Sequence, residues 1–228
     1  VENKDYDTAN EISKTIEPLK SSLLIAQSNK WIEENNYNKF NEYFSCKNEK
    51  DLLAEFFFII ANLYSSQDQF KESNFYINIS NYLNPKFYFN LSLLAENYHL
   101  NDNFTLAKKA LNKFSDEEEI YYWYKTKKIT QFLAEQNGDD VAFAYFQKKI
   151  NNFKNPSNKI LYDIANIYKK FKNYKKAIKY YSIVLSKIDK NTSTFADVLY
   201  RRGGSFERLG NYERADIDLL KSLEIKPD

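Results

Sequence analysis

A unit of about 34 residues recurs along this chain, and that period limits the fold more than any other feature of the sequence. Equivalent positions are occupied by Phe40, Ser73, Ala107, Ala142, Ala177 and Ala215, which follow one another at intervals of 33 to 38 residues. A repeat of this length is one supersecondary unit, and neighbouring units must stack to bury a continuous core. The recurrence therefore predicts a row of similar units.

Each unit also carries a small residue followed three positions later by a larger one, which suits two closely packed helices. The pairs in the regular units are Ala61 and Tyr64, Ala95 and Tyr98, Ala165 and Tyr168, and Gly203 and Phe206. With Ala107, Ala142, Ala177 and Ala215 on the second helices, these are the predicted repeat-packing residues. The chain has four glycines and four prolines, which are too few for a loop-rich β fold. The pattern predicts an all-α solenoid of tandem helix-turn-helix units.

The repeat divides the chain into three parts. We assign residues 1–20 to a partly helical N-terminal segment, 21–53 to an atypical first repeat or cap, and 54–228 to one continuous solenoid domain. Its five units are 54–87, 88–122, 123–157, 158–195 and 196–228. The most apolar run, Phe56 to Ile60 with Ala61 and Leu63, is too short for a membrane span and is predicted to be a buried helix.

Charge and cysteine content exclude several classes of protein. Lys+Arg 33 against Asp+Glu 31 gives a net charge of +2, which is too balanced for general nucleic-acid binding. The absence of an apolar run long enough to cross a membrane predicts a soluble chain. Cys46 is the single cysteine and cannot form an internal disulfide, so the compartment, cytoplasmic or periplasmic, stays open.

The sequence contains few residues of the types that usually act in catalysis. His99 is the only histidine and Cys46 the only cysteine, so catalytic groups and metal sites built from these types have almost no candidates. We expect no cofactor, no metal and no catalytic residue. A cryptic enzyme that uses paired carboxylates is a remote alternative.

The last unit resembles the tetratricopeptide repeat family. The resemblance lies in Leu199 to Gly203, Leu209 to Ala215 and Leu223 to Asp228, and the order of the repeats is similar to that of alphaproteobacterial tetratricopeptide proteins. The resemblance implies a right-handed superhelix whose first helices line a concave groove for a protein or peptide. Carried over to this chain, the implied groove residues are Lys127, Gln131, Tyr162, Asn166, Lys169, Tyr200 and Arg201.

Two further hypotheses, a clamp for a terminal carboxylate and self-assembly, each depend on particular residues. Chaperone-binding relatives hold a terminal carboxylate with cations and amides, but Asp197 stands here where a cation is needed, so the resemblance does not favour such a clamp. The second idea is self-assembly. Because no polar helix follows the last repeat before Asp228, Leu219, Leu220 and Leu223 could bury against a second copy in a homodimer unless more repeats follow.

Overall fold

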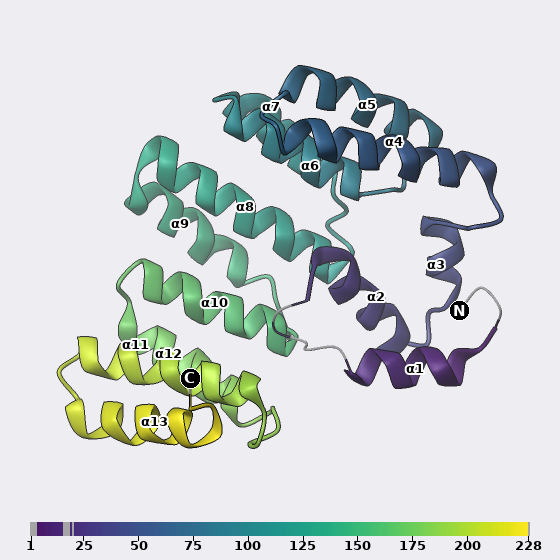
Figure 1. Cartoon of the computed structure of the whole chain (residues 1–228). Helices are drawn as coiled ribbons and strands as arrows, with labels where there is room; N and C mark the ends of the chain where they lie inside the picture. The colour runs from purple at the N-terminus through teal and green to yellow at the C-terminus, as the bar shows by residue number, and fades with distance from the viewer. Residues whose placement is uncertain (1–3, 16–18, 20, 228) are drawn as a thin grey trace. The chain divides into compact units, whose positions relative to one another are not determined.

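The computed structural model is helical throughout (Figure 1). It describes residues 4–15, 19 and 21–227, and within them there are thirteen helices and no strand. The prediction of an all-α fold of tandem helical hairpins is confirmed. Part of the N-terminal segment and the final residue, Asp228, lie outside the described residues. No helix in the described ranges is long and apolar enough to cross a membrane.

After α1 (Tyr6–Thr15), the helices alternate as first and second members of hairpins. The first members are α2 (Leu23–Glu33), α4 (Glu49–Ser65), α6 (Phe89–Leu100), α8 (Glu119–Asn137), α10 (Asn158–Lys170) and α12 (Ser193–Arg208). The second members are α3 (Asn38–Tyr43), α5 (Phe70–Leu83), α7 (Phe104–Leu111), α9 (Asp139–Ile150), α11 (Tyr174–Leu185) and α13 (Tyr212–Ile225).

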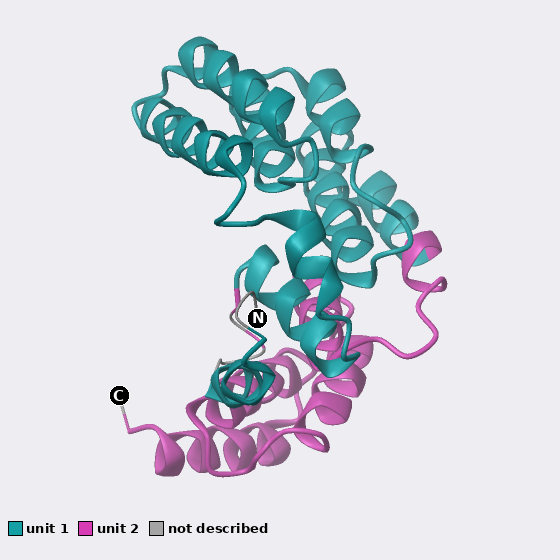
Figure 2. Cartoon of the chain, turned by 90° about the vertical axis from the view of Figure 1, so that its right-hand side faces the viewer, with its two compact units in different colours: residues 1–16, 22–147 teal, residues 17–21, 148–228 magenta. Residues whose placement is uncertain are grey.

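The helices form two compact units (Figure 2). The first unit comprises residues 1–16 and 22–147, and the second comprises 17–21 and 148–228. In the first unit, α4 packs on α5 and α6, and α2 packs on α8. In the second, α10 packs on α11, α11 on α12, and α12 on α13. The sequence-based prediction of a single continuous solenoid stays a prediction.

A residue with left-handed backbone conformation stands in the turn of every hairpin. These residues are Asn35, Asp68, Asp102 and Lys172, with φ between 53° and 59°, and the glycines Gly138 and Gly210, with φ of 87° and 73°. In five of the turns the next backbone N–H donates to the carbonyl five residues earlier, as Asn173 does to Tyr168 at 2.8 Å and Asn211 to Phe206 at 3.0 Å. This pairing satisfies a carbonyl at the helix end and reverses the chain.

The residue after the left-handed position often begins the second helix. The side chains of Asn103, Asn173 and Asn211 accept hydrogen bonds from backbone N–H groups three residues later, at 3.1 to 3.3 Å. Asparagine is a favoured N-cap because its side-chain oxygen satisfies a free donor in the first turn. One short segment therefore ends the first helix and starts the second.

Small residues let the helices of a hairpin approach each other. Ala61, Ala95, Ala107, Ala142, Ala165, Ala177, Gly203 and Ala215 are buried, as is Tyr168, whereas Tyr64, Tyr98 and Phe206 are half-buried. Serines at one repeat position bond across the hairpin: the Ser80 hydroxyl donates to the Ala54 carbonyl at 2.6 Å, and that of Ser222 to the Ala196 carbonyl at 2.8 Å. A buried hydroxyl is thus satisfied by the backbone of the neighbouring helix.

The prediction that the apolar run of α4 is buried is wrong. Phe56, Ile59 and Leu63 are 55%, 61% and 60% exposed, whereas Ala54 and Ala61 on the other side of α4 are fully buried. The buried side is the one that faces α5 and α6. The first hairpin, which the period places next to α4, packs on α8 through α2, and Phe58 of α4 packs against the cluster that contains Trp31 and Tyr43. One side of α4 is therefore left exposed although it is apolar.

Candidate functional site

Three of the predicted groove residues meet in the second unit, on α10 and α12. The side-chain oxygen of Asn166 accepts a hydrogen bond from the Tyr181 hydroxyl at 2.7 Å and another from Nη1 of Arg201 at 3.4 Å. The Arg201 guanidinium also lies over the ring of Tyr162, 5.6 Å from its centroid. Tyr162 is itself buried, so its ring gives the Arg201 guanidinium a fixed surface for a cation–π contact. These contacts fix the amide and the cation relative to each other.

Lys169 adds a second cation to this surface. Its ammonium lies against Gly204 of α12, 3.4 Å from the place where a β-carbon would stand. Burial lowers the pKa of Lys169, and the charges of Arg201 and Arg208 lower it further, while Glu207 acts in the opposite direction. Among the described residues neither Lys169 nor Arg201 forms an ion pair. We call Tyr162, Asn166, Lys169, Tyr200 and Arg201 the α10–α12 face; Tyr200 in it is 64% exposed.

The other two predicted groove residues, Lys127 and Gln131, lie on α8 in the first unit. The side-chain amide of Gln131 donates to Glu135 at 3.1 Å, and Glu135 in turn contacts Nε2 of His99 at 2.9 Å. The ring of His99 stacks on Phe132 with a centroid distance of 4.0 Å. Gln131 therefore belongs to a polar network that joins α8 to α6, and His99 is part of that network.

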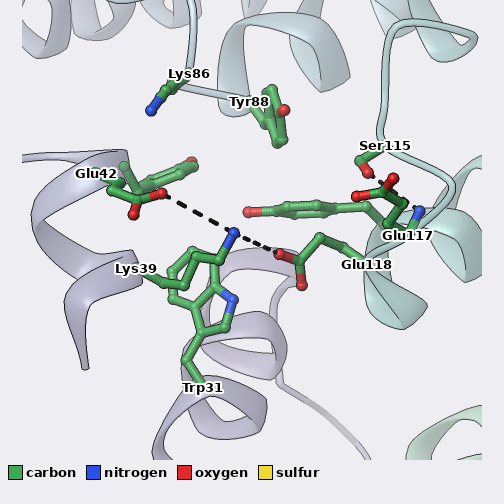
Figure 3. A pocket seen from close by; sticks show the side chains of 10 residues that line it. Trp31, Lys39, Glu42, Lys86, Tyr88, Ser115, Glu117 and Glu118 are labelled. Carbon is green, nitrogen blue, oxygen red and sulfur yellow. Dashed lines mark hydrogen bonds and ion pairs between the residues drawn. The ribbon is translucent and has the colours of Figure 1, made fainter. Parts of the chain in front are cut away.

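A polar pocket in the first unit was not predicted from the sequence (Figure 3). It has a volume of about 210 Å³, and we call it the Trp31 pocket. It is lined by Trp31, Lys39, Glu42, Tyr43, Lys86, Tyr88, Ser115, Glu117, Glu118 and Tyr121. The Lys39 ammonium lies 3.5 Å from a Glu118 oxygen and 3.9 Å from a Glu42 oxygen. The dashed lines in Figure 3 mark these two ion pairs.

An apolar pocket of about 310 Å³ shares Trp31 and Tyr43 with the Trp31 pocket. Seven aromatic side chains line it, and Glu55 is its one charged lining residue. Its lining residues are Leu24, Ser28, Trp31, Phe40, Tyr43, Phe44, Glu55, Phe58, Ile59, Phe87 and Phe89. The exposed side of α4 thus continues, through Ile59, into a cavity beside α2 and α3.

Residue types suited to metal binding are scattered. In the ranges that the structure describes, no three side chains of His, Cys, Asp or Glu are grouped closely enough to hold a metal ion. Cys46 is exposed, and His99 belongs to the α6–α8 network described above.

Two hairpins of the second unit also match a known family in sequence. Residues 159–185 and 196–228, which contain α10–α11 and α12–α13, match the family model described as tetratricopeptide repeat. Both of these hairpins are tetratricopeptide repeats. Members of this family generally mediate protein–protein interaction and act as non-catalytic scaffolds.

Solved structures that are similar to this chain have low sequence identity to it. The MamA protein is similar with a TM-score of 0.51 and 17% identity, covering 77% of this chain and 92% of that one. YrrB, titled a TPR protein with an unusual peptide-binding site, has a TM-score of 0.48 and 16% identity, covering 75% of this chain and 86% of that one. No curated protein sequence matches this chain.

Sequence reasoning missed two features of this chain. Tyr181 belongs to the second helix of its hairpin, so the rule that assigns binding residues to first helices passes over it, although its hydroxyl fixes Asn166. The Trp31 pocket draws on residues between positions 31 and 121, a separation at which the sequence carries no spacing signal.

Proposed function

We propose that this chain binds an extended peptide with an acidic group, and that the α10–α12 face is the binding surface. One observation carries the proposal. Lys169 and Arg201 are two cations on adjacent first helices, and among the described residues neither has a carboxylate partner. Charged groups held together without counterions favour an anionic ligand, which would gain charge-assisted hydrogen bonds from both.

The neighbouring groups suit the rest of a peptide. The oxygen of Asn166 is occupied by Tyr181 and Arg201, which leaves its amide nitrogen to donate to a backbone carbonyl. Tyr200, 64% exposed, offers an aromatic ring next to Arg201. Since the Asn166 and Arg201 side chains are held by Tyr181 and Tyr162 before any ligand arrives, binding would cost little ordering of the receptor.

The test compares acidic and neutral peptides on the parent and on the double variant Asn166→Ala and Arg201→Ala. We expect the parent to bind peptides that carry Asp or Glu, and the double variant to bind them at least tenfold more weakly, because each charged hydrogen bond is worth about 1.5–3 kcal/mol. Lys187→Ala, which removes one exposed positive charge at the end of α11, is the matched control and should bind like the parent.

Two results would contradict the proposal. One is equal affinity of the parent and the double variant for an acidic peptide. The other is equal loss of affinity in Lys187→Ala, which would show that net charge matters and the α10–α12 face does not. Circular dichroism of each variant checks that the helices are retained.

A second candidate function, self-assembly, is favoured by the exposed side of α13. Ile217, Leu220 and Leu223 are 59%, 62% and 55% exposed, and an apolar face of this kind can bury against a second copy. Leu219 does not belong to it, because its side chain packs toward Gly203. Sedimentation across micromolar concentrations tests this function: self-assembly predicts a dimer that Leu220→Glu dissociates, and a parent chain that stays monomeric would exclude it.

A further inference from the structure

The Trp31 pocket contains a buried hydrogen-bond donor without an acceptor. Trp31 is 3% exposed, and its indole nitrogen has no hydrogen-bond partner among the described residues. Tyr121, 2% exposed, lines the same pocket, and burial raises the pKa of its hydroxyl, which stays protonated at neutral pH. Buried polar groups are nearly always paired in folded proteins, so an unpaired donor at the wall of a pocket indicates a missing acceptor.

Charges of both signs surround this donor. Lys39 lies between the carboxylates of Glu42 and Glu118 at 3.9 and 3.5 Å, distances that are long for charge-assisted hydrogen bonds. Lys86 and Glu117 are exposed, and within the described residues neither forms an ion pair. The pocket lining therefore contains positive and negative side chains whose charges are only partly neutralised by ion pairs with one another.

The side chains in Figure 3 lie on three separate segments. Trp31 and Lys39 come from α2 and α3, Lys86 and Tyr88 from the link between α5 and α6, and Ser115, Glu117 and Glu118 from the segment that precedes α8. The Gln27 amide donates to the second Glu118 oxygen at 2.8 Å, which holds that carboxylate at the pocket. A ligand bound here would contact all three segments.

We propose that the Trp31 pocket binds a free α-amino acid as its zwitterion. The ligand carboxylate would accept from the Trp31 indole N–H and pair with Lys39, while its ammonium would pair with Glu118 and Glu117. At about 210 Å³ the pocket is smaller than the roughly 300–1,000 Å³ of sites for drug-sized ligands, and it suits a molecule of this size. The site lies in the first unit and is separate from the α10–α12 face.

The charge balance of the lining disfavours ligands that carry a single charge. Two lysines against three glutamates give a lining charge of −1, which opposes a ligand that carries a carboxylate alone. A ligand with an ammonium alone would leave the Trp31 N–H without an acceptor. A zwitterion supplies both an acceptor for the Trp31 N–H and a positive charge for the glutamates, on neighbouring groups of one molecule.

The indole resonances provide a direct test, because the chain has only two tryptophans. The ¹⁵N-labelled full chain is titrated with each of the common free amino acids in turn. We expect at least one of them to shift the Trp31 indole N–H resonance saturably and to leave that of Trp123 in place. If no amino acid moves the Trp31 resonance, the proposal is overturned.

Blocked ligands and variants then test the assigned roles. For an amino acid that binds, its N-acetyl and its carboxamide derivatives should each bind at least tenfold more weakly, since each has lost one charge. Trp31→Phe, which keeps an aromatic ring without the N–H, and Glu118→Gln should also weaken binding about tenfold. Lys187→Ala in the second unit is the control and should bind like the parent. Unchanged binding of either blocked derivative, or by Trp31→Phe, would refute the zwitterion assignment.

Discussion

Gly203 and Gly204 are neighbours in α12 with opposite surroundings. A β-carbon at Gly203 would stand 3.0 and 3.1 Å from the Leu219 side chain and 3.2 Å from the Ala215 carbonyl, whereas at Gly204 it would meet only the mobile end of Lys169 at 3.4 Å. The first glycine is therefore required by the contact between α12 and α13, and the second is not. Glycine is thus needed for helix packing at position 203, whereas position 204 has room for a larger residue.

We accordingly expect opposite effects of alanine at the two glycines. Gly203→Ala should destabilise the fold by about 1–3 kcal/mol through overpacking against the backbone of α13. Gly204→Ala should stabilise it by up to about 1 kcal/mol, because alanine favours helix over glycine. Urea unfolding followed by circular dichroism measures both, and a loss of stability in Gly204→Ala comparable to that in Gly203→Ala would contradict the packing argument.

Lys169 makes the proposed peptide binding dependent on pH. Burial and the charges of Arg201 and Arg208 lower its pKa from the ordinary 10.5, so the folded chain loses this proton before the unfolded chain does. Between the lowered pKa and 10.5 the unfolded state binds more protons, and this group's contribution to stability therefore rises with pH. A bound carboxylate acts in the opposite direction and raises the pKa again.

At a pH near the lowered pKa of Lys169, binding of an acidic peptide should therefore take up a proton, and affinity should fall as the pH rises through that pKa. Calorimetry in two buffers with different ionisation enthalpies measures the uptake. Lys169→Met should remove this proton uptake, while Lys187→Ala should retain it. Equal uptake by Lys169→Met and the parent would show that another group titrates.

At the scale of elements, the turns explain how hairpins with different sequences reverse the chain in a similar way. The left-handed position holds asparagine, aspartate, lysine or glycine, but the hydrogen bond to the carbonyl five residues earlier is the same in five of the turns. Glycine adopts this conformation without cost, asparagine and aspartate tolerate it, and lysine has no such advantage. The strain of the turn should therefore depend on the residue at this position.

Glycine substitutions should reveal that order. Lys172→Gly should stabilise the chain by about 1 kcal/mol, and Asp102→Gly by less, because aspartate is already tolerated in the left-handed region. Gly210→Ala should destabilise by a similar amount. Thermal unfolding of the three variants checks the ranking, and a destabilised Lys172→Gly would show that Lys172 makes a contact that outweighs its backbone strain.

The repeat period predicted the elements well because it is a local signal. Residues such as Ala177 and Ala215 mark the helix faces that must approach closely, and no distant information is needed to recognise them. The exposed side of α4 could not be foreseen, since Phe56 and Ile59 look the same in the sequence whether or not a preceding hairpin covers them. The clustering of Asn166 with Arg201 was within reach of the repeat register, but the hydroxyl of Tyr181 and the Trp31 pocket depend on tertiary contacts.

At the scale of the whole molecule, stability is divided between two compact units. In the first, Ile77 of α5 is fully buried in a core that includes Leu91 and Phe132. In the second, Arg202 donates from Nε and Nη2 to the two oxygens of the buried Asp218, both at 2.7 Å, and from Nη1 to Ser182 at 3.0 Å. This arginine joins α12 to α11 and α13. Repeat proteins are stabilised mainly by contacts between neighbours, so damage should stay local.

Hydrogen exchange on two variants tests that locality. Ile77→Ala should cost about 2–5 kcal/mol by leaving a cavity, and Arg202→Leu about 3–5 kcal/mol by leaving Asp218 charged without a partner. We expect Ile77→Ala to accelerate exchange in the first unit alone and Arg202→Leu in the second alone. Acceleration across the whole chain in either variant would show that the two units unfold as one.

The left-handed turns also bear on how the chain acquires its fold. Five of the six close a hairpin through a hydrogen bond between residues five positions apart, as Asn36 with Trp31 and Asn103 with Tyr98. Contacts so close in sequence cost little loop entropy, and proteins dominated by them fold in microseconds to milliseconds. The turn of a hairpin can therefore close as soon as its own residues have left the ribosome, whereas a stable core forms only when neighbouring repeats have been synthesised and stack on it.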